Sequence, residues 1–172
     1  MTRARFIEPM LLLSAGKLPQ GPDWLYEIKL DGYRALAIKA GGRVQLRSRN
    51  DNDFTARYAP IMAALRALPD ETVVDSEVVA LDEEGRPFFN LLQNFGTSRA
   101  HLALLVFDVL MLEGRDVTGK TLEQRRRLLE EHILTRLTKP IHYRPFPLCS
   151  QSGLLFVHCE FGRAMKIQIE GF

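Results

Sequence analysis

Residues 24–34 read Trp-Leu-Tyr-Glu-Ile-Lys-Leu-Asp-Gly-Tyr-Arg, and they say more about the fold than any other stretch of the chain. Apolar and polar residues alternate over residues 24–30, which predicts a β-strand with one apolar face. The other side of this run carries a lysine between two carboxylates: Glu27, Lys29 and Asp31. Asp31-Gly32 is a turn signal, and a second alternating run at residues 35–39 predicts another strand across that turn.

Lys29 allows two interpretations. It is either an exposed strand lysine that pairs with Glu27 or Asp31, or a nucleophilic amine inside a charged nucleotide site. Taken alone, the first is the simpler. The motifs that follow along the chain favour the second.

The remaining sequence predicts more strands than helices, without a regular alternation of the two. Further strands are expected at residues 44–49, 72–81 and 103–112. Helices are expected from Pro60 onward, over residues 88–95, and from Thr121 to about residue 136. This order predicts an α+β domain with antiparallel sheets and flanking helices.

The helix that begins near Thr121 has a capping box, because Gln124 follows three residues later. Its charged residues are interpreted as a solvated, salt-bridged face: Glu123, Arg125, Arg126, Arg127, Glu130 and Glu131.

The length of 172 residues suits a single domain, with an irregular lead-in at residues 1–22 and an atypical tail at residues 149–172. A net charge of +2 is too small to indicate a nucleic-acid partner. The two cysteines and four histidines lack the spacing of a zinc site. The longest apolar run, residues 102–112, is half a membrane span, so we expect a soluble cytoplasmic protein without a membrane partner.

Five short motifs follow one another along the chain: Lys29-Leu30-Asp31-Gly32, Ser48-Arg49-Asn50, Asp75-Ser76-Glu77, Phe107-Asp108-Val109-Leu110 and Glu170-Gly171. The order and spacing of the first four resemble the adenylation domain of ATP-dependent DNA ligases, and of bacterial ligase D proteins in particular, and Glu170-Gly171 is a candidate for the family's next element. The likeness extends over about residues 6–148. It implies an ATP-grasp-like nucleotidyltransferase fold.

The resemblance also implies a role for each site residue. Lys29 would attack the α-phosphate of ATP and form lysyl-AMP, with Mg²⁺ or Mn²⁺ as the metal. The other implied nucleotide contacts are Glu27 near the adenine amine, Asp31 and Gly32 beside the lysine, Arg34 and Arg49 at phosphate, Glu77 at the ribose or metal, and Phe107 stacked on the purine. Glu170 is implied as a second metal-directing carboxylate.

The implied reaction continues on DNA. AMP would pass to a 5′-phosphate, and a 3′-hydroxyl would displace it to seal a nick during DNA repair or recombination. Nicked or broken double-stranded DNA and other end-joining repair proteins are therefore the expected partners, at the nucleoid of a bacterial cell.

The electrostatics of Lys29 are consistent with a metal-dependent reaction. A lysine has a reference pKa of about 10.4 and is protonated near neutral pH. Neighbouring carboxylates favour the ammonium form further. Bound metal and basic neighbours must offset Glu27 and Asp31 before the amine can attack.

Several of these residues have structural alternatives. Arg47 and Arg49 would also suit a solvated sheet face, and Phe107 would suit a core position. Asp108 lies in an apolar run and needs a partner if it is buried. Ser76 stands where the family has glycine, and we expect its side chain to weaken nucleotide binding.

Two other functions remain open. The family continues after its Glu-Gly element with a lysine-bearing strand and an OB-fold domain, which this sequence lacks. We therefore expect a C-terminally incomplete domain, and a catalytically impaired remnant that binds nucleotide or DNA is one alternative. An RNA ligase or a capping-type nucleotidyltransferase is the other.

Overall fold

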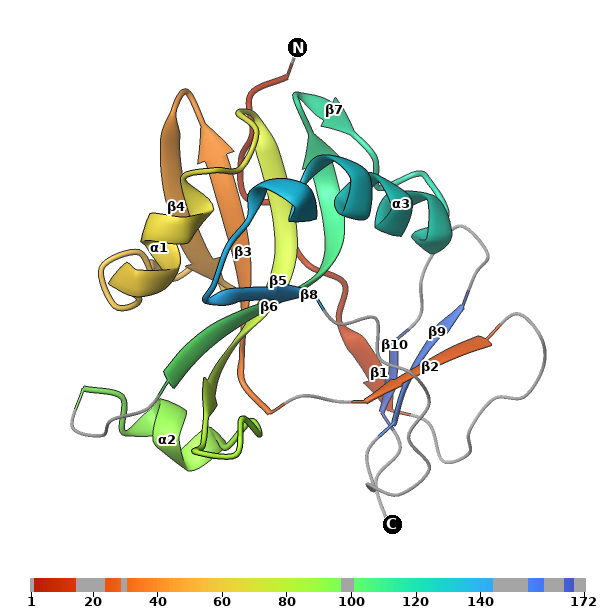
Figure 1. The fold of residues 1–172 in the computed structure, drawn as a ribbon. Helices are drawn as coiled ribbons and strands as arrows, with labels where there is room; N and C mark the ends of the chain where they lie inside the picture. The colour runs from red at the N-terminus through yellow and green to blue at the C-terminus, as the bar shows by residue number, and fades with distance from the viewer. Residues whose placement is uncertain are drawn as a thin grey trace.

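The computed structural model describes residues 2–14, 24–28, 31–96, 101–143, 155–159 and 166–168. The strands of these segments form a larger, six-stranded sheet and a smaller, four-stranded sheet (Figure 1). Helices lie against the larger one. The α+β class with antiparallel sheets and flanking helices is confirmed.

The larger sheet has the strand order β4-β3-β5-β6-β7, with β8 beside β6. Neighbours along that order are antiparallel, and β8 pairs with β6 in parallel. The strands are β3 (Tyr33–Ala40), β4 (Arg43–Ser48), β5 (Thr72–Leu81), β6 (His101–Leu112), β7 (Arg115–Asp116) and β8 (Ile141–Tyr143). Strand β5 has the bounds that its sequence pattern predicts. It lies between β3 and β6, so the residues of all three strands can meet on one face.

The smaller sheet has the order β1-β10-β9-β2. Its strands are β1 (Leu12–Ser14), β2 (Trp24–Ile28), β9 (Leu155–Cys159) and β10 (Lys166–Gln168). The lead-in expected to be irregular thus contributes a strand. The two strands predicted on either side of Asp31-Gly32 are present, and each pairs elsewhere: β2 pairs with β9, whereas β3 pairs with β4 and β5.

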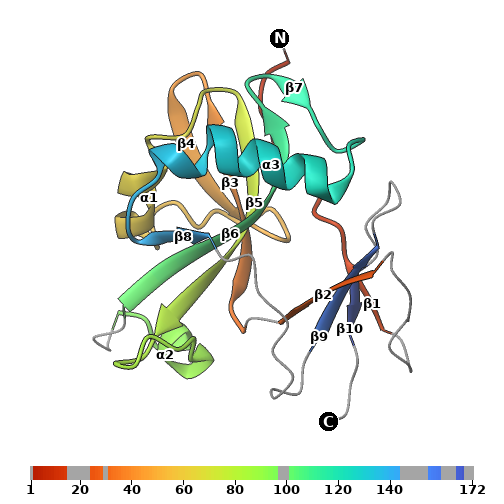
Figure 2. The ribbon, with the colours of Figure 1, turned by 45° about the vertical axis from the view of Figure 1, so that its right-hand side comes forward.

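The helices are α1 (Ala59–Leu65), α2 (Phe89–Gln93) and α3 (Leu122–His132), followed by the 3₁₀ turn η1 (Leu134–Arg136). The views of Figures 1 and 2 agree that α3 crosses one face of the larger sheet. Helix α3 begins where the capping box predicts, since the Thr121 hydroxyl accepts from the Gln124 amide and the Gln124 side chain accepts from the Thr121 amide. It ends four residues earlier than expected, and the tighter η1 turn takes up the remainder.

The two faces of the larger sheet are covered differently. On one face, strand residues such as Val74 and Val78 pack against buried side chains of the helices, including Leu65, Leu129 and Ile133. A smaller apolar cluster lies on the other face, where residues of the N-terminal segment cover the sheet: Ala4, Phe6 and Ile7 pack with Leu36, Ile38, Val73, Leu110 and Met111. The alternation of β-strand side chains explains this division.

Among the helices of the described segments, none is long and apolar enough to cross a lipid bilayer. The domain boundaries expected from the sequence remain predictions.

Candidate active site

Gly32 lies against the backbone of β5. A Cβ atom at this position would meet the Val78 carbonyl oxygen at 2.3 Å, Glu77 Cγ at 2.8 Å and Val79 Cγ1 at 3.0 Å. Only glycine allows this close approach. The glycine of the Lys-x-Asp-Gly motif therefore has a steric reason, and Asp31 beside it is exposed.

The register of the sheet aligns three predicted site residues. Arg34 on β3 pairs directly with Glu77 on β5, and Glu77 pairs with Leu105 on β6. Asp75 pairs with Asp108 and Ser76 with Val106, so Phe107 is an additional residue in β6. This β-bulge lies next to Arg34 and Glu77 in the sheet, although Arg34 and Phe107 are 73 residues apart in the sequence (107 − 34).

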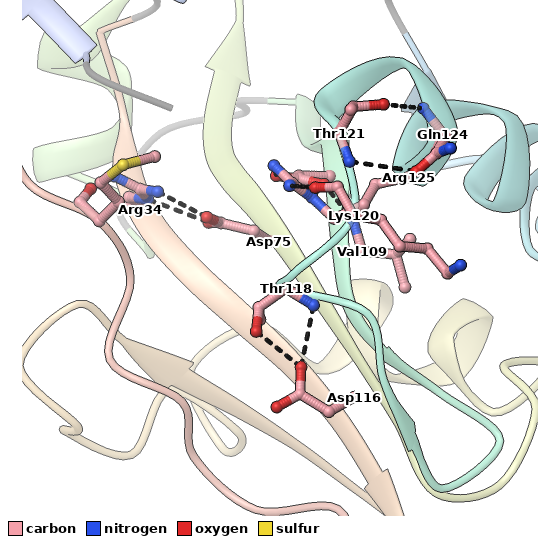
Figure 3. Close-up of polar contacts among 11 residues, drawn as sticks. Arg34, Asp75, Val109, Asp116, Thr118, Lys120, Thr121, Gln124 and Arg125 are labelled. Atoms are coloured by element: carbon pink, nitrogen blue, oxygen red, sulfur yellow. Dashed lines mark hydrogen bonds and ion pairs between the residues drawn. The ribbon is translucent and has the colours of Figure 1, made fainter. Parts of the chain in front are cut away.

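Arg34 is held in place by two neighbours. Its Nε and Nη2 atoms donate to the two carboxylate oxygens of Asp75 at 3.0 and 2.5 Å, and Nη1 donates to the Met10 carbonyl oxygen at 2.6 Å. Figure 3 shows Arg34 and Asp75 pointing toward one another from β3 and β5. Burial would lower the pKa of Arg34, but the hydrogen bond to Asp75 and the charges of Asp75, Glu77 and Asp108 outweigh it and raise the pKa. The guanidinium is therefore a fixed positive charge on this face.

Phe107 is half-buried and lies outside the buried apolar clusters that the described residues form. The Arg34 guanidinium carbon lies 5.8 Å from the centroid of its ring, within the range of a cation–π contact. A core position, the alternative interpretation of this phenylalanine, does not fit these surroundings. Its ring instead borders the charged residues of β3 and β5.

Arg49 lies at the tip of a turn that Ser48 organises. The Ser48 hydroxyl accepts hydrogen bonds from the backbone amides of Asn50 and Asn52, at 3.3 and 3.0 Å. The Arg49 amide donates to the Arg34 carbonyl oxygen at 3.1 Å, so the two arginines are neighbours on adjacent segments of the backbone. The Arg49 side chain is exposed. Its neighbour Arg47, by contrast, is paired with Asp51 at 2.8 Å, as expected for a solvated sheet face.

Ser76 differs from the sequence-based expectation. Its side chain is fully buried, and its hydroxyl donates to the Ala35 carbonyl oxygen at 2.6 Å. Because side chains alternate along β5, Ser76 points away from the face that carries Asp75 and Glu77. The expected interference of this serine with nucleotide binding is therefore not supported by its position.

Asp108 has the buried partner that its apolar surroundings require, and this partner is Arg125 of α3. Nε and Nη2 of Arg125 donate to the two carboxylate oxygens, both at 2.8 Å. The assignment of Arg125 to a solvated face is wrong, since only 6% of the residue is exposed. The spacing of Leu122, Arg125 and Leu129 would have placed it on the buried stripe of the helix.

The electrostatics of this pair reflect its burial. Burial raises the pKa of Asp108, the hydrogen bond and charge of Arg125 oppose the rise, and the charge of Asp75 adds to it. Burial would lower the pKa of Arg125, but its hydrogen bond to Asp108 and the charges of Asp108 and Asp75 raise it. The two-point geometry is that of a charged pair. Two ion pairs thus meet at the centre of the sheet.

Three predicted site residues have side chains outside the described part of the structure. Lys29 and Glu170 lie outside the described residues, and for Glu27 only the backbone, at the end of β2, is described. No group of three or more potential metal-ligating side chains occurs within the described segments. The predicted metal residue Glu77 is half-buried beside Arg34.

Known proteins that are similar to this chain belong to one family. The family model described as "ATP dependent DNA ligase domain" matches residues 10–147. The chain is 38% identical over 160 residues to the multifunctional non-homologous end joining protein LigD of Pseudomonas aeruginosa, covering 91% of this chain and 19% of that protein. It is 43% identical over 120 residues to the corresponding DNA repair protein LigD of Mycobacterium tuberculosis, covering 69% of this chain and 16% of that protein.

A solved structure of a DNA ligase D is also similar to this chain. The structure of mycobacterial DNA ligase D complexed with ATP and MES matches with a TM-score of 0.77 and 27% identity, covering 97% of this chain and 60% of that one. The chain spans 19% and 16% of the lengths of the two LigD proteins.

Proposed function

The chain belongs to the ATP-dependent DNA ligase domain family, and from this premise we propose that it forms the adenylation site of a ligase D-type enzyme. Its first reaction is the transfer of AMP from ATP to a lysine. The Lys29 amine attacks the α-phosphorus, the bond to the bridging oxygen breaks, and pyrophosphate leaves. The amine loses a proton in forming the phosphoramidate.

The observation that carries this proposal is the shared face of Arg34, Glu77 and Phe107 on three adjacent strands. A half-buried aromatic ring suits a purine base, and a carboxylate suits a ribose hydroxyl. Exposed Arg49 next to Arg34 suits the phosphates. A nucleotide combines a base, a sugar and phosphates, so one molecule could contact all three kinds of group.

Arg34 has a narrower role than the one expected from the sequence. Its three nitrogen atoms already donate to Asp75 and Met10. We assign it the role of fixing the positive charge of the site and supporting the Phe107 ring, and we assign phosphate contact to Arg49.

The described residues also suit a divalent metal that arrives with the nucleotide. Mg²⁺ in nucleotide enzymes is held by one or two carboxylates together with phosphate oxygens and water, so it needs no dedicated cluster. Asp75 on this face is bound by Arg34, so we assign the metal contact to Glu77, and Glu170 is a second candidate. Bound Mg²⁺ or Mn²⁺ would neutralise charge at the phosphates.

The test is covalent labelling with α-labelled ATP and Mg²⁺. We expect label on the parent protein, none on Lys29→Ala, and normal labelling of Lys120→Ala, an exposed lysine of the loop before α3. Equal label on Lys29→Ala and on the parent would refute Lys29 as the nucleophile. ATP binding by calorimetry without any label would instead support a non-catalytic, nucleotide-binding remnant.

The later steps belong to the proposal as well. AMP would pass from Lys29 to the 5′-phosphate of nicked or broken double-stranded DNA, and a 3′-hydroxyl would then displace AMP, all by displacement at phosphorus. End-joining repair at the nucleoid, in the cytoplasm, is the setting that fits this chemistry. Transfer of label from the adenylated protein to a nicked duplex tests the second step. Retention of all label on the protein would contradict it.

A further inference from the structure

The β-bulge in β6 gives Phe107 and Asp108 different partners. Phe107 is the additional residue of the bulge, and its ring faces the Arg34 guanidinium. Asp108 is the next residue, and it is bound by Arg125 of α3. Bulges re-aim side chains and are common beside active sites. Any movement of Asp108 along the strand would shift the Phe107 ring.

Asp108 is tightly fixed. Both of its oxygens accept from Arg125 at 2.8 Å, and one of them also accepts from the Val109 amide at 2.8 Å. The pair is almost fully buried, with 7% of the Arg125 side chain and 9% of the Asp108 side chain exposed. These contacts therefore restrict the Asp108 carboxylate to one position, which in turn restricts the backbone of the bulge.

Arg125 is in turn fixed to the start of α3. Its Nη1 atom donates to the Lys120 carbonyl oxygen at 2.7 Å, and its amide donates to the Thr121 carbonyl oxygen at 3.0 Å. Figure 3 shows Arg125 beside Lys120 and the Thr121–Gln124 capping box. The contacts thus run without a break from the helix start to the bulge.

We propose that Arg125 is a positioning residue for the nucleotide site: through Asp108 it holds the bulge and so sets the Phe107 ring for stacking on a purine. Buried ion pairs add little stability compared with apolar pairs of similar volume. The geometry that this pair imposes is a better reason for its presence than stability. The inference rests on the proposed function, because the ring needs a purine to stack on.

The test is a double-mutant cycle on ATP use. The paired variant Asp108→Leu/Arg125→Leu removes both charges together, so that neither is left buried alone. We expect it to melt cooperatively near the parent temperature, to raise the KM for ATP in lysyl-AMP formation about tenfold, and to change the maximal rate by less than about threefold. These values match the loss of one base–aromatic stack.

The cycle is completed by Phe107→Leu, which should raise KM similarly. In the triple variant the two effects should overlap rather than multiply. Arg127→Leu is the matched control, because Arg127 is an exposed arginine of the same helix paired with Glu123, and its KM should equal that of the parent. A parent-like KM in the folded paired variant, or fully multiplicative effects in the triple variant, would overturn the proposal.

Two further outcomes are distinguishable. If the paired variant fails to fold, Arg125→Lys is measured instead, because it keeps the positive charge but loses the two parallel hydrogen bonds to Asp108. A parent-like KM for that variant would overturn the proposal. A parent that binds ATP but is not labelled would refute adenylation alone, and the Kd from calorimetry then replaces KM in the same cycle. A parent that neither binds nor is labelled would refute both.

Discussion

Replacing Gly32 with alanine would place a methyl group against the backbone of β5. The new carbon would lie 2.3 Å from the Val78 carbonyl oxygen. Even a favourable C–H···O contact keeps carbon and oxygen about 3.3–3.6 Å apart. Either the turn that contains Gly32 or strand β5 would therefore have to move by about 1 Å. Strand β5 is paired on both sides, with β3 and β6, and resists that movement.

The magnitude follows from this geometry. Overpacking in a well-packed interior costs about 1–3 kcal/mol, and we expect the upper end because the obstacle is backbone rather than a flexible side chain. For a chain of this size, each kcal/mol lowers the melting temperature by about 2–4 °C. Gly32→Ala should therefore melt about 6–12 °C below the parent. The same methyl group would displace Glu77, so ATP binding should weaken as well.

Gly119→Ala is the matched control. Nothing lies within 4 Å of the position that its Cβ would take, and its φ is outside the left-handed range. The added methyl should be neutral, or stabilising by up to about 1 kcal/mol through the unfolded state.

The assay is urea unfolding of parent, Gly32→Ala and Gly119→Ala, followed by circular dichroism and extrapolated to water. ATP binding by calorimetry below each melting temperature gives the functional effect. If Gly32→Ala is as stable as Gly119→Ala, the close approach of the Lys-x-Asp-Gly turn to β5 does not exist, and the steric explanation for this glycine fails.

Three other substitutions test separate parts of the structure. Ser76→Gly introduces the glycine of the family motif and should leave the Kd for ATP unchanged, because the hydroxyl donates to the Ala35 carbonyl oxygen on the opposite face of the sheet. The loss of this hydrogen bond and the added glycine should lower the unfolding free energy by about 1–2 kcal/mol. Tighter ATP binding of the variant in calorimetry would contradict the unchanged Kd. Asp75→Asn leaves the Arg34 charge poorly compensated and should cost about 3 kcal/mol by urea unfolding, with a parent-like midpoint as the contrary result. Thr121→Ala removes the cap of α3 and should cost about 1 kcal/mol in the same assay, so an unchanged midpoint would show that the cap contributes nothing.

Much of the fold could be predicted from local sequence patterns. The strand predicted at residues 72–81 is β5 with its observed bounds, and the Thr121 capping box predicts the start of α3. Short strands such as β1 and β8 have only three residues each. Three residues are too few for a period-two pattern to stand out, and β8 pairs along the edge of the much longer β6.

The site was predicted in part. The motifs predict Arg34, Glu77 and Phe107 as site residues, and the sheet brings these three together. Lys29, which the motifs predict as the nucleophile, lies outside the described residues. They did not identify Arg125, because a charged residue on a charged helix looks solvated until its partner is known.

Residue order and local chemistry were enough to identify the family and the strands that carry its motifs. The strand register, the bulge at Phe107, the orientation of Ser76 and the Asp108–Arg125 pair all required the folded chain. The physical reason is that alternation and capping act between residues a few positions apart. Register and buried ion pairs join segments that are distant in sequence, so only the pairing of β5 with β6 and the packing of α3 against β6 establish them.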